Sequence, residues 1–354
     1  MIDLEPAAAR LRTFSAIALC LVVGCSGGPP GPQVSSTRDL GPLTFLAAIR
    51  GRDGGHSARF GNRSVWAFGD TMLNFAAEDG SSWRNSTAGS TSDLDPSDGL
   101  PEFSDPVDAK GAPKLLIPFT AEEAAHNATA GAVAWTIWPA ALVVDPATGE
   151  AVLFYMKHQN FKDAGKSIAR WTNPDAAVER PIVAPGTSEP TLLFPAGDFE
   201  PSSGGLAVKG ELYAYACVKG CRVGRVAFAK ALERSAWTFY AGSGRWSATL
   251  SDAIAVLDAP GILSVHWNAH AGKYLAIYSA GANIVMRSAD APEGPWSNET
   301  FVAKPMAPVG GGDVYDAIAH EELSLDNGRR IYVSYSRGTG AFLSQMRLIE
   351  VSLP

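Results

Sequence analysis

Two aspartates in the first part of the chain stand where a carboxylate has no obvious packing role. Asp70 follows the apolar run 65–68 after a single glycine, and Asp53 lies within the Gly-rich motif 50–55. A carboxyl group at the end of a buried strand has a pKa that neighbouring charges and desolvation can tune, and paired carboxyls perform general acid and base catalysis. The alternative is structural, because Asp-Gly is a common turn dipeptide and Asp70 could cap a loop.

These two aspartates belong to a larger repeat. A seven-residue segment rich in aromatic and β-branched residues, here called the signature strand, returns five times, and each copy follows a turn. The copies start 87, 60, 62 and 57 residues apart (151−64, 211−151, 273−211, 330−273) and span 64–70, 151–157, 211–217, 273–279 and 330–336. Hairpin-centred units of this period predict an all-β fold, a five-bladed β-propeller, with each signature strand second in its blade.

The repeat adds a third candidate acid. Counting back 17 residues from the ends of two signature strands reaches Asp53 (70−17) and Glu200 (217−17). We therefore predict Asp53, Asp70 and Glu200 as catalytic groups at one end of the propeller channel. Carboxyl groups on separate loops leave room for a water molecule between them, which favours hydrolysis with inversion of the sugar's configuration. We expect Asp53 to act as the base and Asp70 or Glu200 as the acid.

Side chains near the predicted axial loops are candidates for substrate binding. Aromatic faces suit sugar rings, and an arginine beside Asp53 could hold a carboxylate in its ionised form. The alternative is that the aromatic residues fill the space between blades and that the acid before the fifth inner strand is structural. The candidates are Arg52, Trp83, Trp138, Trp267, Tyr315 and Asp316.

Composition narrows the class of protein. The chain has 354 residues, of which 46% are hydrophobic and 18% charged, and its 36 Gly and 24 Pro suit many short strands joined by turns. The net charge of −7 argues against nucleic acid as a partner. His266 and His270 flank a predicted turn and Gly310 begins a loop with no helix after it, so we expect neither a metal nor a cofactor.

The N-terminus has the pattern of an export signal. Arg10 and Arg12 precede the apolar run 14–23, which is too short to span a bilayer, and the run ends in the lipobox-like motif 22–25. We predict a lipoprotein signal peptide over 1–24, acylation of Cys25, a Gly/Pro/Ser-rich tether over 25–41 and the propeller over 42–354. The expected location is the bacterial cell envelope, on a membrane through the lipid anchor; an ordinary signal peptide is the alternative.

Two cysteines remain after the predicted signal. Cys217 and Cys221 are separated by three residues that look like a hairpin loop, and an exported protein meets an oxidising compartment. We predict a disulfide across this hairpin. Free thiols or a metal site are the alternatives.

The segments 51–55 and 66–71, with 289–296, 331–336 and 347–351, resemble the bacterial family known as domain of unknown function 4185. The resemblance implies a five-bladed propeller related in architecture to furanosidases. Some members of that family are endo-D-arabinanases, and the two aspartates thought to be their catalytic acids correspond to Asp53 and Asp70. The polar insert 85–109 departs from the family pattern.

Two functions compete at this point. The first is a monomeric glycoside hydrolase that cleaves arabinan-like polysaccharide with two carboxyl groups and no cofactor. The second is a non-catalytic surface lipoprotein that binds polysaccharide or a protein partner. They differ in whether Asp53 and Asp70 face one open cleft.

Overall fold

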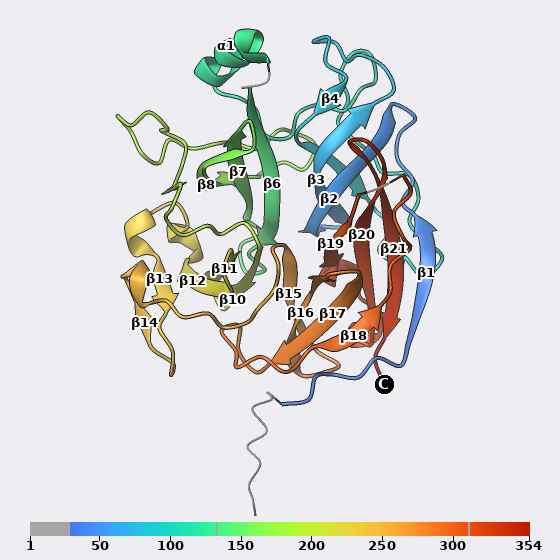
Figure 1. Cartoon of the computed structure of the whole chain (residues 1–354), viewed down its shortest axis with the longest axis vertical. Helices are drawn as coiled ribbons and strands as arrows, with labels where there is room; N and C mark the ends of the chain where they lie inside the picture. The colour runs from blue at the N-terminus through green and yellow to red at the C-terminus, as the bar shows by residue number, and fades with distance from the viewer. Residues whose placement is uncertain (1–28, 132–133, 311) are drawn as a thin grey trace, which may run out of the picture.

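The computed structural model describes residues 29–131, 134–310 and 312–354, and the predicted signal peptide and Cys25 lie outside this part of the chain. Five antiparallel sheets surround one axis (Figure 1). Each signature strand lies in a different sheet, second from the axis, so the predicted five-bladed β-propeller is confirmed.

Each blade begins at the axis and continues outward. The inner strands are β2 (Ile49–Phe60), β6 (Trp135–Val144), β10 (Gly204–Val208), β15 (Leu263–Asn268) and β19 (Val314–Ala319). The second strands are β3 (Arg63–Leu73), β7 (Ala151–Gln159), β11 (Glu211–Cys217), β16 (Lys273–Ala280) and β20 (Arg330–Gly340). The outer strands are β4 (Trp83–Arg84), β5 (Thr87–Thr91), β8 (Lys162–Arg170), β9 (Phe194–Pro195), β12 (Cys221–Ala227), β13 (Thr238–Tyr240), β14 (Trp246–Ser247), β17 (Asn283–Ala289), β18 (Thr300–Ala303), β21 (Leu343–Ser352) and β1 (Ser36–Pro42).

The apolar character of the signature strands follows from their position between blades. Large apolar clusters each join two adjacent blades: Val65 of blade 1 packs in one cluster with Leu153 of blade 2, and Trp66 packs in another with Tyr332 of blade 5. Because both faces of a blade are covered by its neighbours, successive residues of the second strand are buried instead of alternating.

Strand β1 closes the ring. It pairs with β21, so the fifth sheet contains both the first and the last strand of the described chain. Arg38 pairs with Glu350 at 3.0 Å, and Arg347 pairs with Asp39 at 2.8 Å. The predicted tether over 25–41 is therefore wrong from Ser36 onward, because these residues are held in a sheet.

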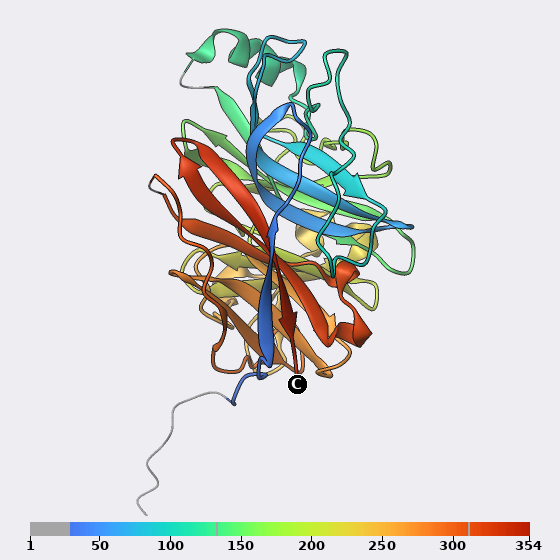
Figure 2. The same cartoon turned by 90° about the vertical axis from the view of Figure 1, so that its right-hand side faces the viewer.

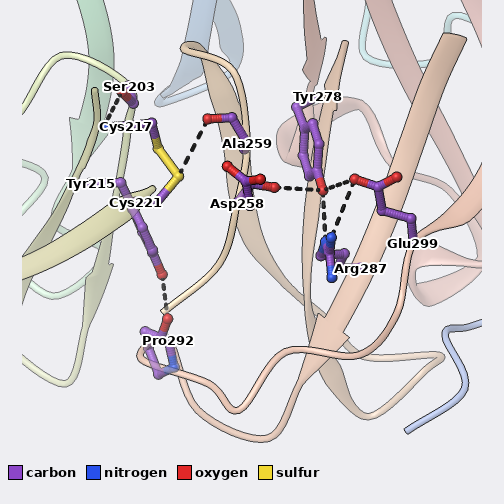
Figure 3. The surroundings of a disulfide bond; sticks show 10 residues. All are labelled: Ser203, Tyr215, Cys217, Cys221, Asp258, Ala259, Tyr278, Arg287, Pro292 and Glu299. Atoms are coloured by element: carbon purple, nitrogen blue, oxygen red, sulfur yellow. Dashed lines mark hydrogen bonds and ion pairs between the residues drawn. A yellow bond between two sulfur atoms is a disulfide. The ribbon is translucent and has the colours of Figure 1, made fainter. Parts of the chain in front are cut away.

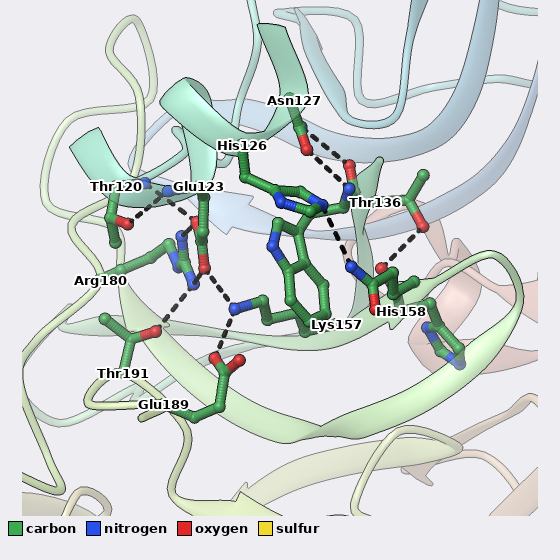
Figure 4. Close-up of polar contacts among 12 residues, drawn as sticks. Thr120, Glu123, His126, Asn127, Thr136, Lys157, His158, Arg180, Glu189 and Thr191 are labelled. Atoms are coloured by element: carbon green, nitrogen blue, oxygen red, sulfur yellow. Dashed lines mark hydrogen bonds and ion pairs between the residues drawn. The ribbon is translucent and has the colours of Figure 1, made fainter. Parts of the chain in front are cut away.

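The ten-residue helix α1 (Ala121–Ala130) packs beside blade 2. Thr120 caps its first turn, and Glu123 accepts from Arg180 at 2.6 Å and from Lys157 at 2.7 Å (Figure 4). This buried charge cluster fixes the segment that leads into β6. Short 3-10 helices occupy Phe228–Lys230, Arg234–Ala236, Leu250–Asp252, Glu321–Leu323 and Asp326–Gly328. In the described part of the chain no helix combines the length and apolar character needed to cross a membrane.

Cys217 and Cys221 form a disulfide across the turn between β11 and β12 (Figure 3). This agrees with the prediction from their spacing. The neighbouring Tyr215 donates a hydrogen bond to the carbonyl of Pro292 at 2.6 Å, which joins blade 3 to blade 4. The pair therefore lies at a point where two blades meet.

The inner strands define two ends of the channel. Residues of all five, such as Ser57, Val143, Ala207, Trp267 and Ala319, line one cavity of about 870 Å³, here called the axial cavity; β2, β6 and β19 contribute only their later residues to it, and the short strands β10 and β15 contribute most of their length. The strands therefore run in the same direction, and their first residues gather at the other end. That end, where Asp53 lies, is here called the acid mouth.

Candidate active site

Glycines shape the backbone around Asp53. The pairing of β2 with β3 shifts on both sides of Gly54, and Gly54 and Gly55 have φ angles of +78° and +94°. A β carbon on Gly69 would lie 2.8 Å from Asp53 Oδ1, so glycine leaves room for that carboxyl group. Such bulges redirect side chains at functional sites. The two motifs singled out in the sequence therefore place Asp53 beside the end of the signature strand.

Asp53 has hydrogen-bond donors from two blades. The Tyr315 hydroxyl donates to Asp53 Oδ2 at 2.8 Å, and the backbone N–H of Asp70 donates to the same carboxyl group. The Tyr315 hydroxyl also hydrogen-bonds with Ser344. Tyr315, predicted to contact substrate, thus orients an acid.

Asp70 is held by two tryptophans. The indole N–H of Trp138, on β6, donates to Asp70 Oδ1 at 2.7 Å, and that of Trp83, on β4, donates to the same oxygen at 3.2 Å. Both tryptophans were predicted to bind substrate, and the structure places them on a candidate catalytic group. Donors of this kind favour the ionised carboxylate.

Asp316 is the third acid of the acid mouth. It lies on β19 of blade 5, with a φ angle of +53°, where the pairing with β20 shifts. The backbone N–H of Gly54 donates to its carboxyl group, and its charge acts on Asp53. The structure therefore brings Asp53, Asp70 and Asp316 together from two adjacent blades.

Burial raises the pKa of all three carboxyl groups, but their neighbours differ. Burial, followed by the charges of Asp316 and Asp70, raises the pKa of Asp53 to about 8. Burial raises the pKa of Asp316 to about 7 and also raises the pKa of Asp70, against which the two indole donors act. All three residues keep partial solvent exposure. A protonated carboxyl beside one supported as an anion is the arrangement that acid–base catalysis requires.

Glu200 is not part of this group. Its carboxylate pairs with Lys166 at 3.3 Å and its charge acts on His158, whereas the charges that act on Asp53 come from Asp316 and Asp70. The predicted equivalence of Glu200 with Asp53 is wrong. Strand pairing shows which residue corresponds to Asp53. Phe68 and Tyr215 are both the fifth residue of their signature strands, and they pair with Gly54 and Gly204. Asp53 precedes the first of these glycines and Ser203 precedes the second, so Ser203 is the residue that corresponds to Asp53.

The three-residue difference between Glu200 and Ser203 has two sources. The turn from β2 to β3 is two residues longer than the turn from β10 to β11, because Ser64 pairs with Arg59 whereas Glu211 pairs with Val208. The bulge at Gly55 adds one more residue. A fixed count along the chain cannot account for either insertion.

Arg52 does not contact the acid mouth. Its guanidinium is buried, pairs with Asp105 at 2.6 Å and lies 4.0 Å and 3.7 Å from the rings of Phe45 and Phe68. Neighbouring residues of a strand point to opposite faces, so Arg52 turns away when Asp53 faces the channel. The prediction of a substrate contact is wrong, and the arginine instead anchors the insert 85–109 through Asp105.

Trp267 also lies away from the acids. It is near the end of β15, lines the axial cavity and is 46% exposed. Since the inner strands run in one direction, a residue late in its strand lies at the far end of the channel. The prediction that Trp267 joins the acids is therefore wrong.

His158, on β7, was missed by the sequence argument. Its ring centroid lies 4.9 Å from that of Trp138, and burial lowers its pKa. His158 directly follows the signature strand 151–157, and no motif surrounds it. Only its place in the repeat, beside Trp138, could have indicated a role at the site. In the described residues no cluster of three or more His, Cys, Asp or Glu is suited to hold a metal ion.

Comparison with known proteins supports the fold. The model of the family described as domain of unknown function 4185 matches residues 207–339, so the predicted resemblance is confirmed over this part of the chain, which contains the segments 289–296 and 331–336. No curated protein sequence matches the chain.

Several solved structures share the architecture. A Bacteroides ovatus ATCC 8483 protein provisionally named a hydrolase has a TM-score of 0.57 and 14% identity, covering 88% of this chain and 87% of its own. A Bifidobacterium bifidum s17 protein provisionally named an exo-β-1,3-galactanase has a TM-score of 0.53 and 15% identity, covering 90% and 94%. A Xanthomonas citri GH43_1 enzyme complexed with xylotriose has a TM-score of 0.50 and 15% identity, covering 88% and 89%.

Proposed function

We propose that this chain, which resembles the domain of unknown function 4185 family, is a glycoside hydrolase that cleaves furanosidic, arabinan-like polysaccharide. The observation that carries the proposal is the gathering of Asp53, Asp70 and Asp316 at one mouth of a five-bladed propeller. Two carboxyl groups in different protonation states, flanking a glycosidic bond, are sufficient for hydrolysis. This chemistry uses no cofactor.

The environments of the carboxyl groups suggest their roles. Asp53, with a pKa near 8, would be protonated at neutral pH and would donate a proton to the leaving oxygen. Asp70, held by two indole donors, would act as the anion that activates water or attacks the sugar carbon. This reverses the role expected for Asp53 from the sequence. Asp316 would keep Asp53 protonated through its charge.

Tyr315 and Trp138 would be positioning residues. The Tyr315 hydroxyl fixes Asp53 from blade 5, and the Trp138 indole fixes Asp70 from blade 2. Both aspartates sit on blade 1, so the blades on either side hold them in place. An acid and a base oriented in this way lower the entropic part of the barrier.

The structural neighbours support a carbohydrate substrate. One of them is a GH43_1 enzyme bound to xylotriose, and another carries the name of a galactanase. Their sequence identities of 15% support a shared fold, and the acid cluster of this chain supplies the argument for catalysis.

Release of reducing sugars from linear and branched arabinans tests the proposal. The wild type should release sugars, and Asp53→Asn and Asp70→Asn should each be nearly inactive while remaining folded. Glu321→Gln is a matched control, because that carboxylate lies at the axial cavity. Wild-type protein that binds arabinan without cleaving it, with equal binding by Asp70→Asn, would replace the hydrolase with the binding-module function.

We also propose export to the bacterial cell envelope with a lipid on Cys25. The motif 22–25 and the preceding apolar run support this location, and a disulfide suits an oxidising compartment. Labelling of cells with a palmitate analogue should tag the wild type and not Cys25→Ser. Equal labelling of both proteins would contradict the lipid anchor.

A further inference from the structure

We propose that Phe161 and Phe342 are two stacking platforms that hold neutral sugar rings of a polysaccharide chain on opposite sides of the acid mouth. The inference rests on the proposed function and names the residues that would position its substrate. It is carried by three properties of these side chains: an unusual backbone conformation, high exposure and a common location.

Both phenylalanines occupy turn positions that normally favour glycine. Phe161 follows Asn160 in the turn between β7 and β8, and their φ angles are +61° and +48°. Phe342, with a φ angle of +57°, precedes the first residue of β21 in the turn after β20. The corresponding turns of blades 3 and 4 contain Gly220 and Gly281, with φ angles of +77° and +56°. A bulky residue in the left-handed region costs about 1–2 kcal/mol.

Packing within the protein does not offset this cost. Phe161 is 79% exposed and Phe342 is 85% exposed, the highest values among the large hydrophobic residues of the described chain. An exposed aromatic ring on a strained turn gains no stabilisation from apolar burial that would offset the backbone strain. Two such rings indicate a partner that covers them.

The two turns flank the blade that carries the acids. Each turn joins the second strand of its blade to the third, so both lie at the end of the channel where the inner strands begin. Phe161 belongs to blade 2 and Phe342 to blade 5, with blade 1 between them. In Figure 2 the turn between β20 and β21 lies on the same side of the molecule as helix α1 and the start of β6.

Each platform is linked to an acid through intervening residues. The ring of Phe161 lies 6.2 Å from that of Trp138, whose indole donates to Asp70. Phe342 is two residues before Ser344, whose hydroxyl hydrogen-bonds with Tyr315, the donor to Asp53. A chain resting on both rings would therefore cross the acids between them.

The chemistry of the surface selects the occupant. A phenylalanine ring offers an apolar face to the C–H face of a sugar and has no hydrogen-bonding group for a peptide backbone. The negative charge of Asp70 and Asp316 at the mouth makes an anionic polymer unfavourable there. We therefore assign the platforms to a neutral polysaccharide with several sugar units on each side of the scissile bond.

Affinity measurements in the Asp70→Asn background test the inference, because that variant should bind arabinan without cleaving it. Phe161→Gly and Phe342→Gly should each weaken arabinan binding by roughly 3–10-fold, as expected for one lost aromatic contact. Phe161→Trp should restore binding. Phe301→Ala is the matched control, because Phe301 is 58% exposed on the outer strand of blade 4 and should leave the affinity unchanged.

The glycine variants also separate a lost contact from a folding defect. Glycine relieves the left-handed strain, so both variants should melt at the wild-type temperature or above it. If Phe161→Gly and Phe342→Gly bind arabinan as tightly as Phe301→Ala does, the assignment of the two rings to substrate binding is wrong. The hydrolase proposal would not be affected by that result. Failure of the Asp70→Asn parent to bind arabinan, together with an inactive wild type, would overturn both. If these glycine variants lose binding to anionic lipid vesicles and keep their affinity for arabinan, the two rings contact a membrane and the proposal is wrong.

Discussion

The two ends of the propeller channel both contain titratable side chains, but of different kinds and in different arrangements. The acid mouth holds Asp53, Asp70 and Asp316, each partly exposed and each reached by a hydrogen-bond donor. The axial cavity holds His56 and His266, which are buried and have ring nitrogens without a hydrogen-bond partner. Burial lowers the pKa of both histidines to about 4, so they are neutral.

The difference shows that the size of a cavity does not locate the chemistry. The axial cavity has a volume of about 870 Å³, yet β10 and β15, which line it along most of their length, pair with their neighbours without a register shift. The acid mouth is built where β2 and β19 break their register, and the bulges point carboxyl groups toward one another. Irregular backbone therefore distinguishes the acid mouth from the other end of the channel.

Removing an acid should produce the largest contrast between the two ends. Asp53→Asn and Asp70→Asn should each lower kcat for arabinan cleavage by roughly 10²–10⁴-fold, because each removes a proton donor or acceptor. Glu321→Gln, at the axial cavity, should change kcat by less than about threefold. Steady-state kinetics measures all three variants. A comparable loss of kcat in Glu321→Gln would mean that the chemistry is not confined to the acid mouth.

The indole donors give the next largest effect. Trp138→Phe should lower kcat by roughly tenfold and move the acidic limb of the pH profile upward, because Asp70 loses its 2.7 Å donor and its anion becomes less stable. Trp267→Phe at the axial cavity should leave both quantities unchanged. A pH profile for Trp138→Phe that coincides with the wild-type profile would mean that the indole does not tune Asp70.

The pH dependence of the wild type should be bell-shaped. Asp53 must be protonated to donate, so kcat should fall as pH rises through about 8. Asp316→Asn removes a charge that raises the pKa of Asp53, so its alkaline limb should move to lower pH. Kinetics between about pH 4 and pH 10 checks this result. An alkaline limb that is unaffected by Asp316→Asn would show that the two carboxyl groups do not interact.

The fold and part of the site were predictable from the sequence because they depend on local patterns. The signature strands are apolar throughout since neighbouring blades cover both of their faces, and that composition repeats along the chain. Asp53 and Asp70 stood out because each interrupts a glycine-rich or apolar segment. The indole donors were found as axial aromatics, although their hydrogen bonds to Asp70 depend on how three strands meet.

The remaining assignments failed where position depends on irregular structure. Counting along the repeat gave Glu200 in place of Ser203 because a longer turn and a bulge shift the register. Arg52 is next to Asp53 in sequence, yet strand alternation sends it to Asp105. Trp267 was misplaced because the sequence alone did not show at which end of its inner strand it lies.

The smallest effect concerns stability, and its sign distinguishes a functional carboxyl from a structural one. The folded pKa of Asp53 is about 8, above its ordinary value of 3.8, so the folded protein keeps a proton that the unfolded chain releases. This contribution to stability is complete below about pH 4 and is lost as pH rises through about 8. An asparagine side chain does not titrate, so Asp53→Asn should melt about 2–4 °C higher than the wild type at about pH 9, with a smaller difference at about pH 5. At the axial cavity the pKa of His266 is lowered to about 4 instead of raised, so the folded protein holds this ring neutral at both pH values. His266→Gln should therefore show no gain that grows between them. Thermal melts of both variants at the two pH values test the contrast, and a melting temperature of Asp53→Asn that falls relative to the wild type as pH rises would mean that this carboxyl stabilises the fold as an anion.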